Sequence, residues 1–345
     1  MEYVKLRDIT TKITKGTTPS NIGASFAEEG INYFRSEMLG KAKYLDKSSG
    51  MMFISESTHN KLKRSQIEAD DILFSMAGIY LGKLAIVKEE DVPANTNQAV
   101  ALIRFNKGVN IDYLYYFMVQ KSFNAYVNCM SAQAAQPNIN LKQIGNLQIA
   151  LPTDEQQKRI ADILSAYDNL IENNNKRIKL LEQMAENLYK EWFVRFRFPG
   201  YKDVEFIDGF PKEWKICRID QLSKIKAGGD APDDSTKEIT DECSIPIYSN
   251  GIENEGLYGY TSKAKISKPS ITISARGTVG YTCLRRVSYT PIVRLICVIP
   301  HEEKLVNWLF YHFKRTIVIA NGTSQQQITI PMMSREKVLL PTNDL

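Results

Sequence analysis

The feature that most constrains the fold is an internal repeat, because the chain presents one pattern twice. Ile72–Gly78 reads ILFSMAG, and Ile271–Gly277 reads ITISARG in a second copy. Further matched pairs follow in the same order and at similar spacing: Ile111–Tyr116 with Val306–Tyr311, Gln136–Leu141 with Gln325–Ile330, and Leu151–Thr153 with Leu340–Thr342. Repeats of about 20 to 50 residues build solenoids or propellers. A much longer repeat predicts two copies of a whole domain, and two like surfaces suit a ligand with two comparable halves.

Length and composition fit such a pair of domains. A chain of 345 residues is long enough for about two domains with separate cores. The apolar share of 43% and charged share of 24% are those of a soluble globular protein. No apolar run reaches the about 18 residues that cross a bilayer, and the N-terminus lacks the pattern of a secretory signal. We expect a cytoplasmic protein, whose net charge of +5 mildly favours polyanions.

Cysteines and histidines predict no metal or cofactor site. The five cysteines are scattered and form no CxxC pair, so buried reduced thiols are expected. They are Cys129, Cys217, Cys243, Cys283 and Cys297. The three histidines share no metal-ligand spacing. They are His59, His301 and His312.

Each copy predicts short strands, long polar loops and one helix. In the first copy, the expected strands are 30–34, 71–76, 84–87 and 99–105, and the expected helix is 112–127. In the second copy, the expected strands are 245–248, 270–274 and 293–298, and the expected helix is 303–316. Polar loops are expected at 15–29, 35–66, 227–244 and 249–268. Their side chains are of the kinds that reach phosphates and base edges, although each loop taken singly is also an ordinary solvated loop.

A long helix is predicted between the two copies. Thr153 and Gln156 have the spacing of a capping box at its start, and the helix should end near Phe198-Pro199-Gly200. Its apolar residues recur at alternating spacings of three and four, as in a coiled-coil seam, and Asn174 interrupts that seam. Some forty residues at about 1.5 Å each make a rod of roughly 60 Å. A spacer is favoured over a helix buried in one globule, because the outer face is charged throughout. The fold class is therefore α+β, with two similar α/β domains separated by a long coiled-coil-type helix.

Three segments carry a resemblance to a known family. Leu151–Leu164, Asp168–Asn175 and Met184–Phe196 together resemble the central conserved helix of type I restriction–modification specificity subunits (HsdS). Phe206–Trp214 resembles the start of that family's second target-recognition domain. The resemblance covers essentially the whole chain in the order recognition domain, helix, recognition domain.

The resemblance implies a DNA-recognition function. In this family each recognition domain binds one half of a split duplex DNA site, and the conserved helices set the gap between the halves. Those helices also dock two methyltransferase subunits, which use S-adenosylmethionine to methylate adenine, and a restriction/translocase subunit joins the complex. The specificity subunit itself has no catalytic residues. The implied domains are 1–152 and 199–341 for recognition and 153–198 for the central helix.

The C-terminal end departs from the family pattern. Leu340-Pro341-Thr342 should lead into a second conserved helix, and residues 342–345 are only a stub of it. We therefore expect the central helix either to self-associate or to take its partner helix from a separate chain. Asn174 would help to select that partner.

Two sets of residues are predicted to contact partners. The DNA contacts are expected in loops repeated between the copies, from side chains that can donate to bases and phosphates. In the first copy they are Lys15, Thr17, Thr18, Arg35, Ser36, Ser75 and Gln136; in the second they are Lys226, Ser249, Asn250, Ser274, Arg276 and Gln325. Arg276 is the best single candidate, because arginine makes the commonest specific contact with guanine. The docking seam is Ile160, Ile163, Tyr167, Leu170, Asn174, Ile178, Leu181, Leu188 and Trp192.

Competing functions find little support in the residues. The chain has no Asn-Pro-Pro-aromatic motif and no Gly-rich cofactor loop of a DNA methyltransferase. Gly78 to Gly82-Lys83 is one residue too short for a P-loop. Pro232-Asp233-Asp234 lacks the Glu-x-Lys of a nuclease and is better explained as a turn. A coiled-coil scaffold that binds only proteins remains an alternative, which duplex DNA binding would distinguish.

Overall fold

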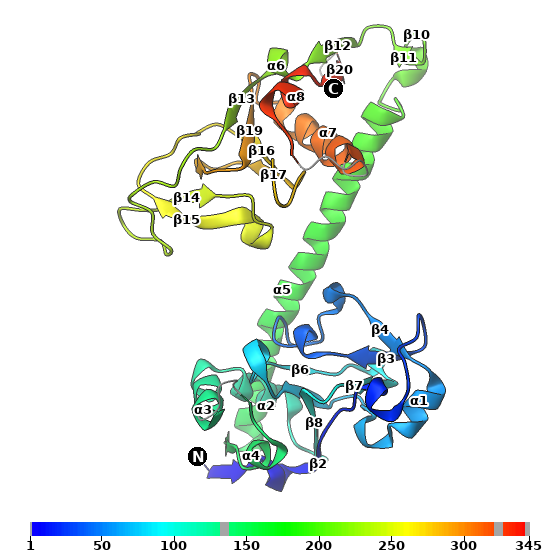
Figure 1. The fold of residues 1–345 in the computed structure, drawn as a ribbon, viewed down its shortest axis with the longest axis vertical. Helices are drawn as coiled ribbons and strands as arrows, with labels where there is room; N and C mark the ends of the chain where they lie inside the picture. Colours follow the sequence, from blue (N-terminus) through cyan, green and yellow to red (C-terminus); the bar gives the residue numbers. More distant parts are fainter. Residues whose placement is uncertain (1, 132–137, 321–326, 342–345) are drawn as a thin grey trace. The chain divides into compact units, whose positions relative to one another are not determined.

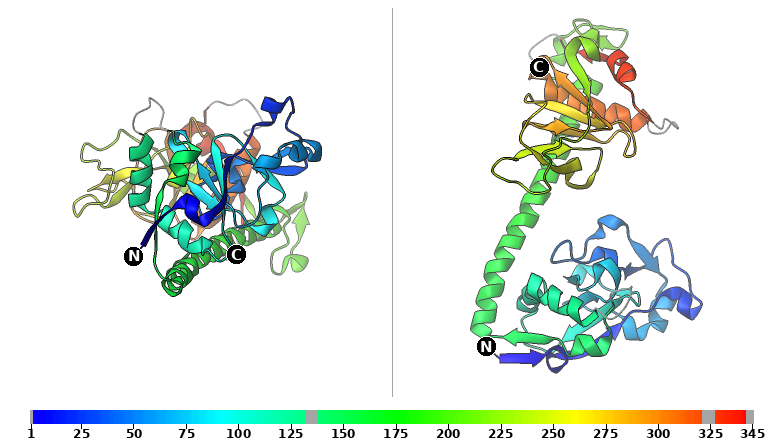
Figure 2. Two further views of the ribbon diagram at one scale, coloured as in Figure 1. Left: turned by 90° about the horizontal axis from the view of Figure 1, so that it is seen from below. Right: turned by 60° about the vertical axis from the view of Figure 1, so that its left-hand side comes forward.

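The computed structural model describes residues 2–131, 138–320 and 327–341 (Figure 1). The chain forms two compact units, Met1–Arg177 (unit 1) and Ile178–Leu345 (unit 2). The division falls within helix α5 (Asp154–Tyr189), which Figure 2 shows as one continuous helix. Each unit has its own sheets and its own apolar core.

Unit 1 is built on two main sheets. The four-stranded antiparallel sheet has the order β2 (Thr10–Lys15), β8 (Val100–Phe105), β5 (Ile72–Ser75), β6 (Leu84–Ile86). The three-stranded sheet has the order β4 (Met52–Ile54), β3 (Ile31–Phe34), β7 (Ala94–Thr96), and β1 (Glu2–Lys5) pairs with β9 (Gln148–Leu151). The helices are α1 (Glu56–Lys61), α2 (Ile111–Met118), α3 (Lys121–Ser131) and α4 (Leu141–Gly145).

Unit 2 has the same arrangement, strand for strand. Its four-stranded sheet has the order β13 (Ser223–Ala227), β19 (Leu295–Pro300), β16 (Ser270–Ser274), β17 (Thr282–Arg285). Its three-stranded sheet has the order β15 (Leu257–Thr261), β14 (Ile245–Tyr248), β18 (Thr290–Pro291), and β12 (Lys215–Arg218) pairs with β20 (Lys337–Leu340). The helices are α6 (Ile219–Leu222), α7 (Leu305–Ala320) and α8 (Ile330–Arg335). The hairpin β10 (Phe206–Ile207)–β11 (Phe210–Pro211) precedes these elements. The predicted duplication of a whole domain is confirmed.

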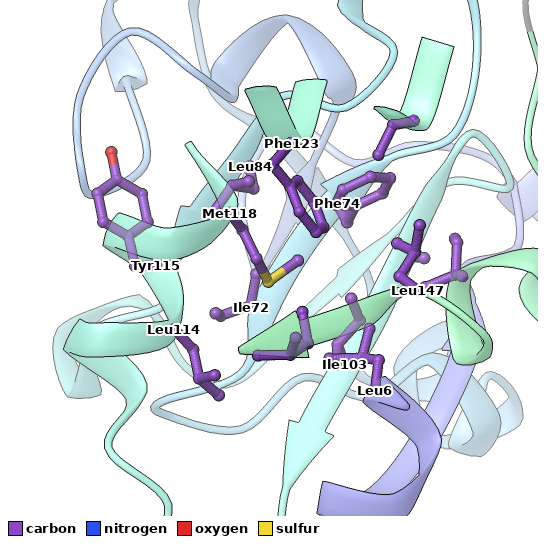
Figure 3. Packing of buried hydrophobic residues seen from close by; sticks show 14 of the residues in the cluster. Leu6, Ile72, Phe74, Leu84, Ile103, Leu114, Tyr115, Met118, Phe123 and Leu147 are labelled. Carbon is purple, nitrogen blue, oxygen red and sulfur yellow. The ribbon is translucent and has the colours of Figure 1, made fainter. Parts of the chain in front are cut away.

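Matched helices close matched cores. In unit 1, Leu114 and Met118 of α2 lie over the four-stranded sheet, where Ile72 and Phe74 of β5 and Ile103 of β8 are buried (Figure 3). In unit 2 the same places are taken by Leu309 and Phe313 of α7 and by Ile271 and Ile273 of β16. The repeated apolar residues of the sequence are therefore core positions.

Several sequence predictions need correction. The helix expected over 112–127 is two helices, because the chain turns between Met118 and Lys121. The loop expected at 35–66 contains β4 and α1, and the loop expected at 249–268 contains β15. The edge strands β2 and β13 were not predicted, because their many lysines and threonines give a weak apolar alternation.

The central helix begins as expected. The Thr153 amide donates to Gln156 Oε1 at 3.3 Å, and the Gln156 amide donates to Thr153 Oγ1 at 3.4 Å, which confirms the capping box. After Tyr189 the chain makes one π-helical turn (Lys190–Val194) before leaving the helix. Within the described part of the chain, no helix combines the length and the apolar character needed to cross a bilayer.

Candidate nucleic-acid interface and docking surface

One edge of each four-stranded sheet gathers the repeated loops. At this edge the first strand ends, the second begins, the third ends and the fourth begins, and we name it the loop edge. In unit 1 it joins three segments: the Met76 amide donates to Ala99 O at 2.8 Å, and the Ile139 amide donates to Met76 O at 2.9 Å. In unit 2 the equivalent bonds run from Ala275 to Arg294 at 2.8 Å and from Ile328 to Ala275 at 3.0 Å. The two loop edges are therefore equivalent bond by bond.

A glycine in each copy lets the chain pass close to a neighbouring backbone segment at this edge. An added Cβ would lie 1.9 Å from Thr96 O at Gly16 and 2.1 Å from Ile292 O at Gly228. Both distances are far inside van der Waals contact with a backbone atom, so only glycine fits at these two positions. Each of the paired glycines thus places the segment that follows the first strand of its sheet, β2 or β13, against the equivalent loop of its own unit.

The second-copy candidates lie together at the loop edge of unit 2. The Asn250 amide nitrogen donates to the Arg276 carbonyl at 2.8 Å, and Gly277 follows with a left-handed φ of 75°. Arg276 is exposed and donates through Nη2 to Gln327 Oε1 at 2.6 Å. Lys226, near the end of β13, is exposed, whereas Ser249 is half-buried.

Beside these residues lies a shallow cavity of about 510 Å³. Its lining includes Arg276, Arg294, Gln327 and Thr329. A concave surface lined by two arginines suits an anionic or hydrogen-bond-accepting ligand.

Several of the first-copy candidate side chains form hydrogen bonds or an ion pair within unit 1. The Thr18 hydroxyl donates to the side chain of Gln98, and Arg64 Nη2 donates to Thr17 Oγ1 at 3.4 Å. Arg35 forms an ion pair with Glu37 at 2.9 Å, and Ser36 beside it is half-buried. Lys15, at the end of β2, is exposed.

Two candidate serines are buried. Ser75 is 0% exposed and Ser274 is 1% exposed, because each ends a strand that is covered on both faces. Neither side chain can reach DNA in this fold, so their expected contact is wrong. Gln136 and Gln325 lie outside the described residues, and their predicted contacts stay predictions.

Sequence reasoning missed two side chains of the unit 2 edge, Arg294 and Gln327. Arg294 was placed inside a predicted strand, 293–298, whereas the strand begins at Leu295. The repeat includes Gln327, but the predicted contact is Gln325, two residues before it. A lone arginine at the start of an apolar strand was the available signal.

The docking seam of α5 is largely exposed. Seven of its apolar side chains have exposed fractions between 38% (Ile160) and 64% (Tyr167). The exposed members are Ile160, Ile163, Tyr167, Leu170, Ile178, Leu181 and Leu188, and Asn174 is exposed among them. Trp192 is the exception: it is half-buried and contacts Phe193, with ring centroids 6.3 Å apart.

A polar face of α5 packs on unit 1 in place of the seam. Lys43 is only 7% exposed, and its Nζ lies 2.9 Å from both Ser165 Oγ and Asp112 Oδ1. The Tyr116 hydroxyl donates to Asp168 Oδ2 at 2.6 Å. Burial and this hydrogen bond raise the pKa of Tyr116 well above its usual value, so the phenol stays protonated and donating. The apolar seam is therefore left for another surface.

The far end of α5 packs on unit 2 through aromatic rings. Tyr189 is buried, with its ring centroid 5.3 Å from that of Phe193 and 5.9 Å from that of Tyr311 on α7. The seam residues Leu181 and Leu188 lie outside this contact and are 60% and 50% exposed. Both ends of the helix thus bury a face other than the seam.

Comparison with known proteins matches both copies. The family described as "Type I restriction modification DNA specificity domain" matches residues 1–183 and 211–344. The chain belongs to this family. A Mycoplasma pneumoniae protein assigned as a type I specificity subunit is 30% identical over 239 residues, which cover 69% of this chain and 61% of that protein. The type I restriction enzyme MjaIX specificity subunit of Methanocaldococcus jannaschii is 29% identical over 234 residues, covering 66% of this chain and 52% of the relative.

The match therefore spans between half and two thirds of the length of these two relatives. A solved structure agrees on the fold of this family. The S subunit of a type I restriction–modification system from M. genitalium superposes with a TM-score of 0.59 at 15% identity. It covers 98% of this chain and 84% of that chain. At this identity the likeness concerns the fold, which is the α+β fold with a long helix that the sequence predicts.

Proposed function

We propose that this protein is the DNA-specificity subunit of a type I restriction–modification complex and recognises a bipartite duplex site. The observation that carries the proposal is the family match over both copies, together with two loop edges that are equivalent bond by bond. Each loop edge would read one half of the site. The domain division 1–152, 153–198 and 199–341, and a cytoplasmic location, belong to this proposal.

The residues proposed to contact DNA are those that remain accessible. In unit 2 they are Lys226, Ser249, Asn250 and Arg276, and in unit 1 they are Lys15, Thr17, Thr18, Arg35 and Ser36. Side chains with N–H and O–H donors position a protein on phosphates and read base edges. The net charge of +5 supports an anionic partner.

Assembly is proposed to use the exposed seam of α5. An apolar stripe left in water invites a protein partner, because covering it removes apolar surface from water at about 25 cal/mol per Å². We propose methyltransferase subunits, which use S-adenosylmethionine, as the occupants, with a restriction/translocase subunit joining the complex. Self-association through the seam, or a helix supplied by a second chain, is the competing use. The protein itself would carry out no catalytic step.

The test of DNA recognition is a selection with the full chain from a duplex pool randomised over the whole binding site. A bipartite consensus, and binding that weakens steeply with salt, is expected, because phosphate contacts release counterions. The alternative, a coiled-coil scaffold that binds only proteins, predicts no enrichment of any duplex. That outcome would overturn the proposal.

The test of docking uses the double variant Leu181→Asp/Leu188→Asp in cells that express the methyltransferase subunit. Charges in the seam should abolish co-purification, whereas Lys179→Asp, on the exposed surface of the same helix, should leave it intact. Light scattering on the wild-type chain alone then separates self-association from docking. Unchanged co-purification of the double variant would exclude the seam as the docking surface.

A further inference from the structure

The two loop edges have the same backbone but different side chains. The bond-by-bond equivalence pairs Ala77 with Arg276 and Ala99 with Arg294, because Met76 corresponds to Ala275. Unit 1 therefore presents methyl groups at two positions where unit 2 presents guanidinium groups. The first pair is already visible in the repeated sequence. The second pair, Ala99 with Arg294, is visible only in the hydrogen bonds of the structure.

Arg276 is held in place from its own edge. Its Nη2 donates to Gln327 Oε1 at 2.6 Å, and its carbonyl accepts from Asn250 Nδ2 at 2.8 Å. Five N–H donors in a planar fork leave several directed outward after one bond to Gln327. The bond to Gln327 thus orients the exposed guanidinium and leaves its other N–H groups available to a ligand.

Arg294 has an unfavourable backbone conformation. Its φ is 75°, a left-handed value that costs a residue with a side chain roughly 1–2 kcal/mol. Glycine would adopt this conformation freely, and the arginine is exposed. No partner of its guanidinium lies among the described residues of unit 2. A strained, exposed arginine without a described partner supports the hypothesis that its side chain binds a ligand there.

Arg276 and Arg294 line one cavity of about 510 Å³. We propose that these two arginines are specificity-determining residues that read guanine in the half-site bound by unit 2. Arginine donates two N–H groups to guanine O6 and N7, which no other base offers as a pair of acceptors in the major groove. Unit 1 lacks an arginine at either equivalent position, so the two half-sites differ in chemistry. This inference rests on the proposed function.

The experiment repeats the duplex selection with full-chain variants. Arg276→Ala and Arg294→Ala should each relax a guanine preference in one half-site by about ten-fold or more, and leave the other half-site unchanged. Arg276→Lys and Arg294→Lys keep the charge but lose the fork, so they should relax the same positions. Arg294→Gly removes the side chain and the strain together, and thus protects the test against a folding failure.

Arg286→Ala is the matched control. Arg286 directly follows β17, whose last residue lies at the end of the sheet away from the loop edge. Its Nη2 donates to Asn307 Oδ1 at 2.8 Å. The same loss of charge at Arg286 should leave the base preferences in both half-sites unchanged.

The outcomes separate base reading from other contacts. Uniform weakening over all sequences, a shallower salt dependence and rescue by lysine would indicate phosphate contacts and overturn the inference, while the proposed function would stand. An unchanged consensus in the alanine variants would also overturn it. A wild-type chain that enriches no duplex would overturn the proposed function and this inference with it.

Discussion

Two adjacent glycines in unit 2 differ sharply in what surrounds them. A Cβ at Gly228 would lie 2.1 Å from the Ile292 carbonyl, whereas at Gly229 the nearest atom would be the flexible end of Lys265 at 3.5 Å. We predict that Gly228→Ala destabilises unit 2 by about 1–3 kcal/mol, because backbone must move. Gly229→Ala, the control, should be nearly neutral. Urea unfolding followed by tryptophan fluorescence measures both, because all 3 tryptophans lie in unit 2. Equal effects of the two changes would contradict this account.

The cysteines are not all buried, contrary to expectation. Cys243, Cys283 and Cys297 are buried, but Cys129 on α3 is exposed. Burial raises the pKa of the Cys297 thiol to about 11. A thiol in an unfolded chain has a pKa of about 8.5.

The raised pKa and the burial of Cys297 predict that alkylating reagents label the cysteines selectively. Only the thiolate reacts, and the fold favours the neutral thiol at Cys297 from the unfolded pKa up to about pH 11. At pH 9 an alkylating reagent should label Cys129 quickly and Cys297 only after denaturation. Mass spectrometry of peptides reports each site. Fast labelling of Cys297 in the native protein would mean that the β19 core opens readily.

At the scale of the element, the two faces of α5 should respond oppositely to substitution. Tyr189 is 6% exposed and packs against Tyr311, so Tyr189→Ala should cost unit 2 about 3 kcal/mol. Leu181 is 60% exposed on the seam, so Leu181→Ala should change stability by less than about 0.5 kcal/mol. Tryptophan-monitored unfolding of the isolated chain compares the two. A large cost at Leu181 would show that the seam is already covered in solution, as self-association requires.

At the scale of the whole molecule, α5 is expected to set the gap between the half-sites. Four residues inserted after Asn174 add about 6 Å of helix and rotate the seam by only about 40° beyond one full turn. At about 3.4 Å per base pair, the recognised gap should lengthen by about two base pairs. Sequencing of selected duplexes measures the gap. Replacing Asn173–Asn175 by alanines, which keeps the length, should leave it unchanged. A constant gap after the insertion would rule out the spacer role.

The sequence by itself determined the architecture. The repeat, the capping box at Thr153 and the apolar periods of Ile111–Tyr116 and Val306–Tyr311 were enough for two like domains and one long helix. The capping box and the apolar periods are local signals, because the spacing of apolar residues along one segment indicates whether it forms a strand or a helix. The family resemblance rested on the same segments.

Only the tertiary structure decided which side chains face outward. Ser75 and Ser274 looked like paired ligands but are buried, because sheet and helix cover both faces of their strands. Asn250, Arg276, Arg294 and Gln327 come from segments far apart in the chain and meet only when the sheet brings them to one edge. The face of α5 that packs on unit 1 is polar, because Lys43 and Tyr116 supply hydrogen-bond partners for its side chains. The apolar period along α5 does not reveal these partners. Contacts between distant segments depend on packing, and the pattern of a single segment carries no record of them.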